Sequence, residues 1–129
     1  MEGTKIVVYI AGPVTGVAKY WEAFEQAEDD LTACGCIPLS PARLPEGMTN
    51  AQYMRTCFAM IDSADAVLFL PDSDKSKGAR LERDYCAYVK KPMMTYREFD
   101  SCGGRINPRE ARLHFIKFQM DQMEEVFGE

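Results

Sequence analysis

The chain has 129 residues, which is enough for one domain with a single hydrophobic core and too few for two. Its composition, 47% hydrophobic and 27% charged, is typical of a soluble globular protein, and a net charge of −5 argues against binding of nucleic acid, which needs a basic stripe. We recognise no signal peptide and no apolar run long enough to cross a membrane, so we expect a cytoplasmic protein without a membrane partner.

The first segment of the chain predicts a buried strand followed by a glycine-rich turn. The run Lys5–Ala11 is apolar and β-branched, as in a central parallel strand. The turn after it carries Gly12 and Gly16, which let the backbone come close to a ligand and present N–H groups to a phosphate. It matches neither the Walker A pattern nor G-x-G-x-x-G.

Residues 17–63 predict two helices separated by a short strand and an irregular loop. The first helix, 17–34, has an apolar stripe and stops at Gly35; Trp21 beside the stripe is interpreted as a packing anchor rather than a base-stacking platform. Residues 36–38 form a short strand, and the proline-containing loop 39–48 is expected to line the site. Thr49 and Gln52 resemble a capping box that opens the second helix.

The second half of the core continues the alternation of strands and helices. We expect strands at 66–70 and 92–96 and a helix at 78–90 between them. This order predicts an α/β protein with a parallel sheet of four or five strands.

In the tail, residues 107–127 are predicted to form a helical extension; the alternative is a fifth strand at 113–118. Either is able to pack on the core or on a second subunit, and we expect a homodimer or higher homo-oligomer.

The cysteines indicate reduced thiols rather than disulfides or a metal centre. Their number is odd, they form no C-x-x-C pair, and the chain has a single histidine, His114. We therefore expect no metal and no cofactor. The cysteines lie at positions 34, 36, 57, 86 and 102.

The segment Ser76–Glu82 is the main candidate for chemistry. It follows a predicted buried strand and opens a helix, which is where α/β sheets bind ligands. Glu82 would lie near the positive end of that helix as an ionised carboxylate, and a positioned carboxylate is a nucleophile towards a sugar carbon. The alternative is an ordinary carboxylate on the helix surface.

Four motifs in this order resemble the nucleoside 2-deoxyribosyltransferase superfamily, especially its small DUF4406-like branch found in phages and prophages. They are Tyr9-Ile10-Ala11-Gly12-Pro13-Val14-Thr15-Gly16, Tyr53-Met54-Arg55, Ala64-Asp65-Ala66 and Ser76-x-Gly78-Ala79-x-x-Glu82. The resemblance covers roughly residues 5–96 and implies a single-domain, three-layer Rossmann/flavodoxin-like fold. It also implies cleavage or exchange of N-glycosidic bonds in nucleosides or nucleotides.

The resemblance assigns roles to individual residues. It makes Glu82 the nucleophile and lets the Tyr9 hydroxyl orient it. Ser76 stands where superfamily members that act on free nucleosides carry an acid, which favours a nucleoside 5′-monophosphate over a nucleoside as the ligand. The alternative role of Ser76 is to cap the helix. The remaining substrate-binding residues expected are Gly12, Pro13, Thr15, Gly16 and Gly78.

One position departs from the superfamily pattern. Cys57 occupies the place of an aspartate that helps to position the sugar and base, so a second carboxylate is missing. Asp74, in the loop after the third strand, is a candidate to protonate the leaving base, although such a loop is also ordinary solvated surface. The departure leaves a second hypothesis open, a non-catalytic nucleotide-binding module that acts as a sensor or decoy. A third is an assembly subunit with a vestigial pocket.

Overall fold

The computed structural model describes residues 5–14 and 17–101, and their strands and helices alternate along the chain. The predicted tail elements, 107–127 and 113–118, lie outside the described residues. The elements are β1 (Val7–Ala11), α1 (Tyr20–Ala33), β2 (Ile37–Leu39), η1 (Pro41–Arg43), α2 (Asn50–Ser63), β3 (Ala66–Phe69), η2 (Ser73–Lys75), α3 (Lys77–Tyr88), β4 (Met93–Thr95) and α4 (Tyr96–Ser101).

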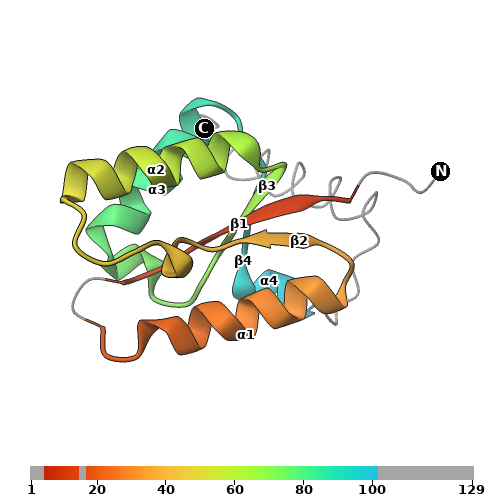
Figure 1. Ribbon diagram of the computed structural model, residues 1–129. Helices are drawn as coiled ribbons and strands as arrows, with labels where there is room; N and C mark the ends of the chain where they lie inside the picture. The colour runs from red at the N-terminus through yellow and green to blue at the C-terminus, as the bar shows by residue number, and fades with distance from the viewer. Residues whose placement is uncertain (1–4, 15–16, 102–129) are drawn as a thin grey trace.

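The described strands form one parallel sheet with the order β2-β1-β3-β4. Helices α1 and α4 cover one face and α2 and α3 cover the other, so the molecule has three layers (Figure 1). This confirms the predicted Rossmann/flavodoxin-like α/β fold. The chain leaves β1 towards β2 on one side and returns to β3 on the other, and ligands bind such sheets outside the carboxyl ends of the strands at this switch point.

The central strand β1 divides the core into two parts. Successive side chains of a strand point to opposite faces, so Val8 and Ile10 pack with α1 and α4, while Tyr9 and Ala11 face α2 and α3. The apolar stripe predicted for α1 is confirmed, because Phe24 and its helical neighbours are buried against the first of these faces. Tyr9 is thus the one phenol that β1 places in the core beneath α3.

Helix starts follow the side chains that accept hydrogen bonds from the first turn. The predicted capping box of α2 is confirmed: Thr49 and Gln52 bond reciprocally to each other's backbone N–H at 3.1 and 2.9 Å. Helix α4 was not predicted, and the strand expected at 92–96 overlaps it only at Tyr96. The pattern Thr95-x-x-Glu98 is the signal that sequence reasoning overlooked, because these two residues make the same reciprocal contacts.

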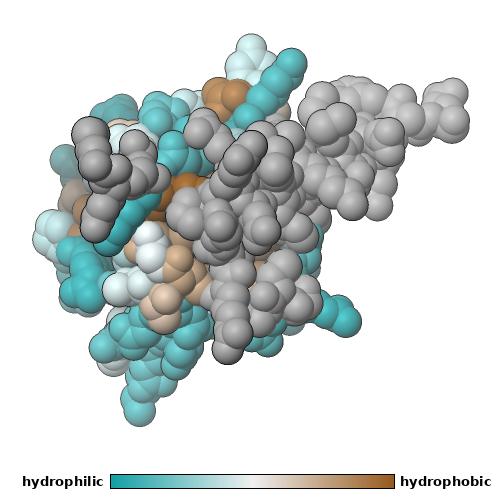
Figure 2. Space-filling model, turned by 90° about the vertical axis from the view of Figure 1, so that its right-hand side faces the viewer, coloured by the Kyte–Doolittle hydropathy of each residue, from teal (hydrophilic) through white to brown (hydrophobic). Residues whose placement is uncertain are grey.

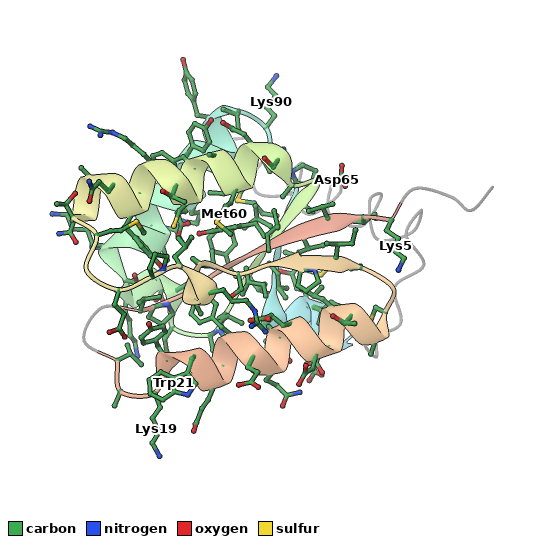
Figure 3. The ribbon with its side chains drawn as sticks, in the orientation of Figure 1. Lys5, Lys19, Trp21, Met60, Asp65 and Lys90 are labelled. Atoms are coloured by element: carbon green, nitrogen blue, oxygen red, sulfur yellow. The ribbon has the colours of Figure 1, made fainter. Side chains whose placement is uncertain are left out.

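Asp65, part of one of the four motifs, lies at the amino end of the sheet and not near the ligand-binding end. Its Oδ2 accepts a hydrogen bond from the Val7 N–H at 2.9 Å, as the position of Asp65 beside the end of α2 in Figure 3 illustrates. This bond fixes the start of β1 against β3. We conclude that Asp65 stabilises the fold.

The surface matches the composition. On the side from which β1 enters the sheet, the visible described residues are mainly hydrophilic, with small apolar patches between them (Figure 2). Among the described residues no helix is long and apolar enough to span a membrane. Trp21 is 48% exposed and points away from the sheet (Figure 3), so its interpretation as a packing anchor is wrong. Its ring contacts that of Tyr20 edge to face. The four cysteines of the described ranges are free thiols.

Gly12 is required where the loops after β1 and β3 meet. A Cβ atom at this position would lie 2.9 Å from Leu70 Cδ1 and 3.0 Å from Leu70 Cβ, closer than such atoms approach. Leu70 is buried, and its N–H donates to the Ala11 carbonyl at 2.8 Å, so it has little room to withdraw. The glycine therefore permits the close approach of two loops at the switch point.

We predict that Gly12→Ala lowers the free energy of unfolding by about 1–3 kcal/mol, the usual cost of overpacking. Gly78→Ala is the matched control, because its Cβ would lie 3.5 Å from Met54 Sδ, an ordinary contact, in the first turn of α3. Urea unfolding of both variants measures the difference. Equal stability of the two variants would contradict the packing argument.

Candidate active site

A tyrosine and a glutamate form a buried pair between the sheet and α3. The Tyr9 hydroxyl, on β1, donates a hydrogen bond to Glu82 Oε2. Tyr9 is completely buried and Glu82 is 5% exposed, although Glu82 belongs to a helix that is otherwise rich in charged, exposed side chains. Burial excludes the interpretation of Glu82 as an ordinary surface residue. A carboxylate taken out of water needs a donor, and Tyr9 supplies it.

Two residues of α2 complete the cluster. The Cys57 thiol lies within hydrogen-bonding reach of the phenols of both Tyr9 and Tyr53. Cys57 is fully buried, whereas Tyr53 is half-buried. Within the described ranges, these contacts bring no second carboxylate to Glu82, so Cys57 occupies its place with a neutral group. Tyr53 belongs to a motif of the resemblance but was assigned no role in the site. Its spacing of four residues from Cys57, which puts both side chains on one side of the helix, is the signal that could have linked them.

Burial sets the protonation states of the cluster. Desolvation raises the pKa of Glu82 from its ordinary 4.5 to about 7, against the opposing effect of the hydrogen bond from Tyr9. The pKa of Tyr9 is raised by its own burial and then by the charge of Glu82, so the phenol keeps its proton. Burial likewise raises the pKa of Cys57 to about 11. Glu82 is therefore the group in this cluster that changes charge near neutral pH.

The start of α3 lies beside the cluster. Ser76 is the N-cap residue, and its Oγ accepts a hydrogen bond from the Ala79 N–H at 3.3 Å. Gly78 follows in the first turn and faces Met54 of α2. The amino ends of α2 and α3 are thus adjacent, with N–H groups at the end of each helix that favour anions.

A cavity of about 270 Å³ opens next to these helix starts, and we call it the Tyr53 cavity. It is bounded by the loop after β1, the segment from η1 to α2, and the first turns of α1 and α2. Tyr53 belongs both to this cavity and to the buried cluster, and so connects the two. Residues of loop 39–48 line this cavity, and the expectation that the loop lines the functional site stays a prediction. The lining residues are Val14, Tyr20, Pro41, Leu44, Pro45, Glu46, Gly47, Met48, Asn50 and Tyr53.

The structure brings some of the predicted site residues together and separates others. Gly12 and Pro13 follow β1 at the carboxyl edge, next to the Tyr53 cavity, whereas Thr15 and Gly16 lie outside the described residues. Asp74 is on η2 and lines a different cavity, on the other side of α3. Its assignment as the acid for the leaving base stays a prediction, and no contact in the described structure joins it to Glu82.

Metal ligands are not clustered in the part of the chain that the structure describes. Residues 5–14 and 17–101 contain no group of three or more histidine, cysteine or acidic side chains placed to hold an ion.

Comparison with known proteins places the chain in a family. Residues 6–95 match the family described as domain of unknown function DUF4406. The chain belongs to this family. The match includes Tyr9, Cys57, Ser76 and Glu82. No curated protein matches the sequence.

Two solved structures share the fold. One is a 2-deoxyribosyltransferase from Bacillus psychrosaccharolyticus, with a TM-score of 0.54 and 20% identity over 69% of this chain and 70% of that chain. The other is a conserved protein from Enterococcus faecalis V583, with a TM-score of 0.57 and 12% identity over 95% of this chain and 98% of that chain. The predicted resemblance to 2-deoxyribosyltransferases is thereby confirmed at the level of the fold.

We predict that Glu82 makes the stability of the protein depend on pH. Its pKa is higher in the folded protein, about 7, than its ordinary 4.5, so the folded state holds the proton longer. The contribution of neutral Glu82 to the free energy of unfolding is fully present below pH 4.5 and is lost as the pH rises through 7. The loss is about 3 kcal/mol at 1.36 kcal/mol per pKa unit.

Urea unfolding of the wild type and of Glu82→Gln, at intervals from pH 4.5 to 8, measures this contribution as the difference between two curves. The variant keeps the shape of the side chain and does not titrate. As the pH rises, the free energy of unfolding of the wild type should therefore decrease relative to that of Glu82→Gln. Parallel curves would show that Glu82 is not buried in the folded state.

Proposed function

We propose that the protein cleaves or exchanges the N-glycosidic bond of a nucleoside or nucleoside 5′-monophosphate, with Glu82 as the nucleophile. The observation that supports this most is the buried Glu82 carboxyl of α3, which accepts a hydrogen bond from Tyr9 and belongs to a cluster that Tyr53 connects to a cavity. The likeness of the fold to a 2-deoxyribosyltransferase supports the same reaction class.

The reaction needs the charged form of Glu82. One carboxylate oxygen attacks the anomeric carbon while the electrons of the glycosidic bond leave with the base, which is then protonated. The product is a glycosyl ester of Glu82. Attack on that ester by water gives hydrolysis, and attack by a second base gives transfer. Tyr9 holds the carboxylate in one orientation throughout, because its raised pKa keeps the donating proton on the phenol.

In this proposal the substrate occupies the Tyr53 cavity. Tyr53 and Tyr20 supply aromatic walls and hydroxyl groups for the sugar and base. The first turn of α3, capped by Ser76, offers N–H groups and no acid to a 5′-phosphate. Expected partners are small molecules only, and the chemistry requires no cofactor.

Cys57 favours a second candidate function, a nucleotide-binding module without turnover. A neutral thiol with a pKa of about 11 supplies neither charge stabilisation nor a proton at pH 7. Such a protein would bind nucleotides in the same cavity and release no base. The two functions therefore differ in chemistry and share the binding site.

We predict release of free base from at least one member of a panel of nucleosides and 5′-monophosphates, followed by chromatography. Glu82→Gln should lower the rate by about three orders of magnitude or more, as expected on loss of a covalent nucleophile. The wild-type rate should rise with pH and level off above 7, because the charged form of Glu82 accumulates through its pKa of about 7. Glu25→Gln, an exposed change on α1, is the control and should leave the rate unchanged.

Base release that is equally fast in Glu82→Gln would contradict the assignment of the nucleophile. Nucleotides that raise the melting temperature while no base appears would instead identify the binding module.

The phosphate preference is tested at Ser76. We predict that monophosphates bind more tightly than the matching nucleosides, and that Ser76→Asp reverses this order by placing a charge against the phosphate. Aspartate is also a good N-cap residue, so the helix start should be preserved. Ser76→Thr is the control that keeps the hydroxyl. Calorimetry that finds equal affinities for both ligand classes in the wild type would remove the phosphate argument.

A further inference from the structure

A second cavity, of about 480 Å³, lies at the carboxyl edge of the sheet where β3 and β4 end. Helix α3 bounds it from one face of the sheet and the start of α4 from the other. Its volume is within the range of roughly 300–1,000 Å³ that small-molecule sites span. Three guanidinium groups line it, those of Arg80, Arg83 and Arg97, and we call it the arginine cavity.

The arginine cavity is separate from the Tyr9–Glu82 cluster. Each residue of an α-helix turns by about 100°, so Arg80 lies about 160° around α3 from Glu82, and Arg83 lies about 100° away. Glu82 faces Tyr9 and α2, whereas the two arginines face β4 and α4. The helix therefore presents two different chemistries on two of its sides.

The charge of this cavity is unusual for the molecule. The chain carries a net charge of −5, yet none of the three arginines makes an ion pair with any residue of the described ranges. The lining also contains Asp72 and Asp74, and Asp72 is already paired with Lys75 at 3.3 Å. Positive charge thus exceeds negative charge locally, and the guanidinium donors are available to an anion.

The floor of the cavity is apolar. Phe69 and Met93, at the ends of β3 and β4, are buried there, and Tyr96 adds an aromatic wall. A bare inorganic anion would use the arginines and leave this surface uncovered. A ligand with both an anionic group and a flat apolar ring uses the whole cavity.

We propose that the arginine cavity binds a nucleoside phosphate as a second ligand, with the phosphate on the arginines and the base against the apolar floor. The arginines suit phosphate because each guanidinium donates two parallel hydrogen bonds to its oxygens. This proposal does not depend on Glu82 acting as a nucleophile. A ligand at this position contacts the helix that carries Glu82, and so is placed to influence the orientation of that carboxyl.

The experiment counts bound ligands by calorimetry with ADP and GDP, with adenosine and pyrophosphate as probes that lack the phosphate or the base. The double variant Arg80→Gln/Arg83→Gln should bind one nucleotide fewer per chain than the wild type, or bind it on the order of tenfold more weakly, through loss of charge-assisted hydrogen bonds. Arg55→Gln, exposed on α2 outside the cavity, is the matched control and should bind as the wild type does.

The outcome separates this proposal from the proposed function. The site lost in the double variant reports the arginine cavity, and a site that remains reports the Tyr53 cavity. If the double variant melts at a lower temperature than the wild type, Arg97→Gln provides an independent test, because it removes a different arginine of the same cavity and should also weaken nucleotide binding there. Unchanged number and affinity in both arginine variants would overturn the proposal, as would an equal loss in Arg55→Gln, which would show a general effect of charge.

Discussion

The hydrogen bond from Tyr9 to Glu82 is the interaction on which the candidate site depends. It joins the central strand β1 to helix α3 across the core and provides the donor that a buried carboxyl group needs. Burial and the hydrogen bond act in opposite directions on the pKa of Glu82, and burial prevails, which leaves the value at about 7. One pair of side chains thus explains why an acid is tolerated in the core and why it is poised to change charge near neutral pH.

The buried surroundings of Glu82 offer a physical reason for a cysteine, rather than a carboxylate, at position 57. A carboxylate at that position would lie close to Glu82 in a buried environment, and two neighbouring carboxylates do not ionise together easily. A thiol avoids the repulsion and packs among apolar residues, with Tyr9 and Tyr53 in reach. Within the described contacts, Glu82 is therefore the one carboxyl group of the cluster.

Much of the fold could be predicted from the sequence because its signals are local. The apolar run of β1, the stripe of α1 and the capping box at Thr49 each act within a few residues. The prediction failed at α4, whose capping box was not recognised, and at Trp21, which was interpreted as a packing anchor although it is exposed. The motif around Glu82 predicted the right helix, yet the surroundings of Glu82 depend on contacts 73 positions apart in the chain, such as that with Tyr9. The arginine cavity was not foreseen, because residues of α3 and α4 meet there only after folding.

The state of the Glu82 carboxyl group is measured by ¹³C NMR titration, with glutamate labelled at the side-chain carbon and Glu82→Gln used to assign the signal. We expect the Glu82 signal to titrate near pH 7, well above its ordinary 4.5. In Tyr9→Phe the midpoint should move higher still, because the charged form loses its hydrogen-bond donor. A midpoint near 4.5 that is unaffected by Tyr9→Phe would show that Glu82 is neither buried nor hydrogen-bonded to Tyr9.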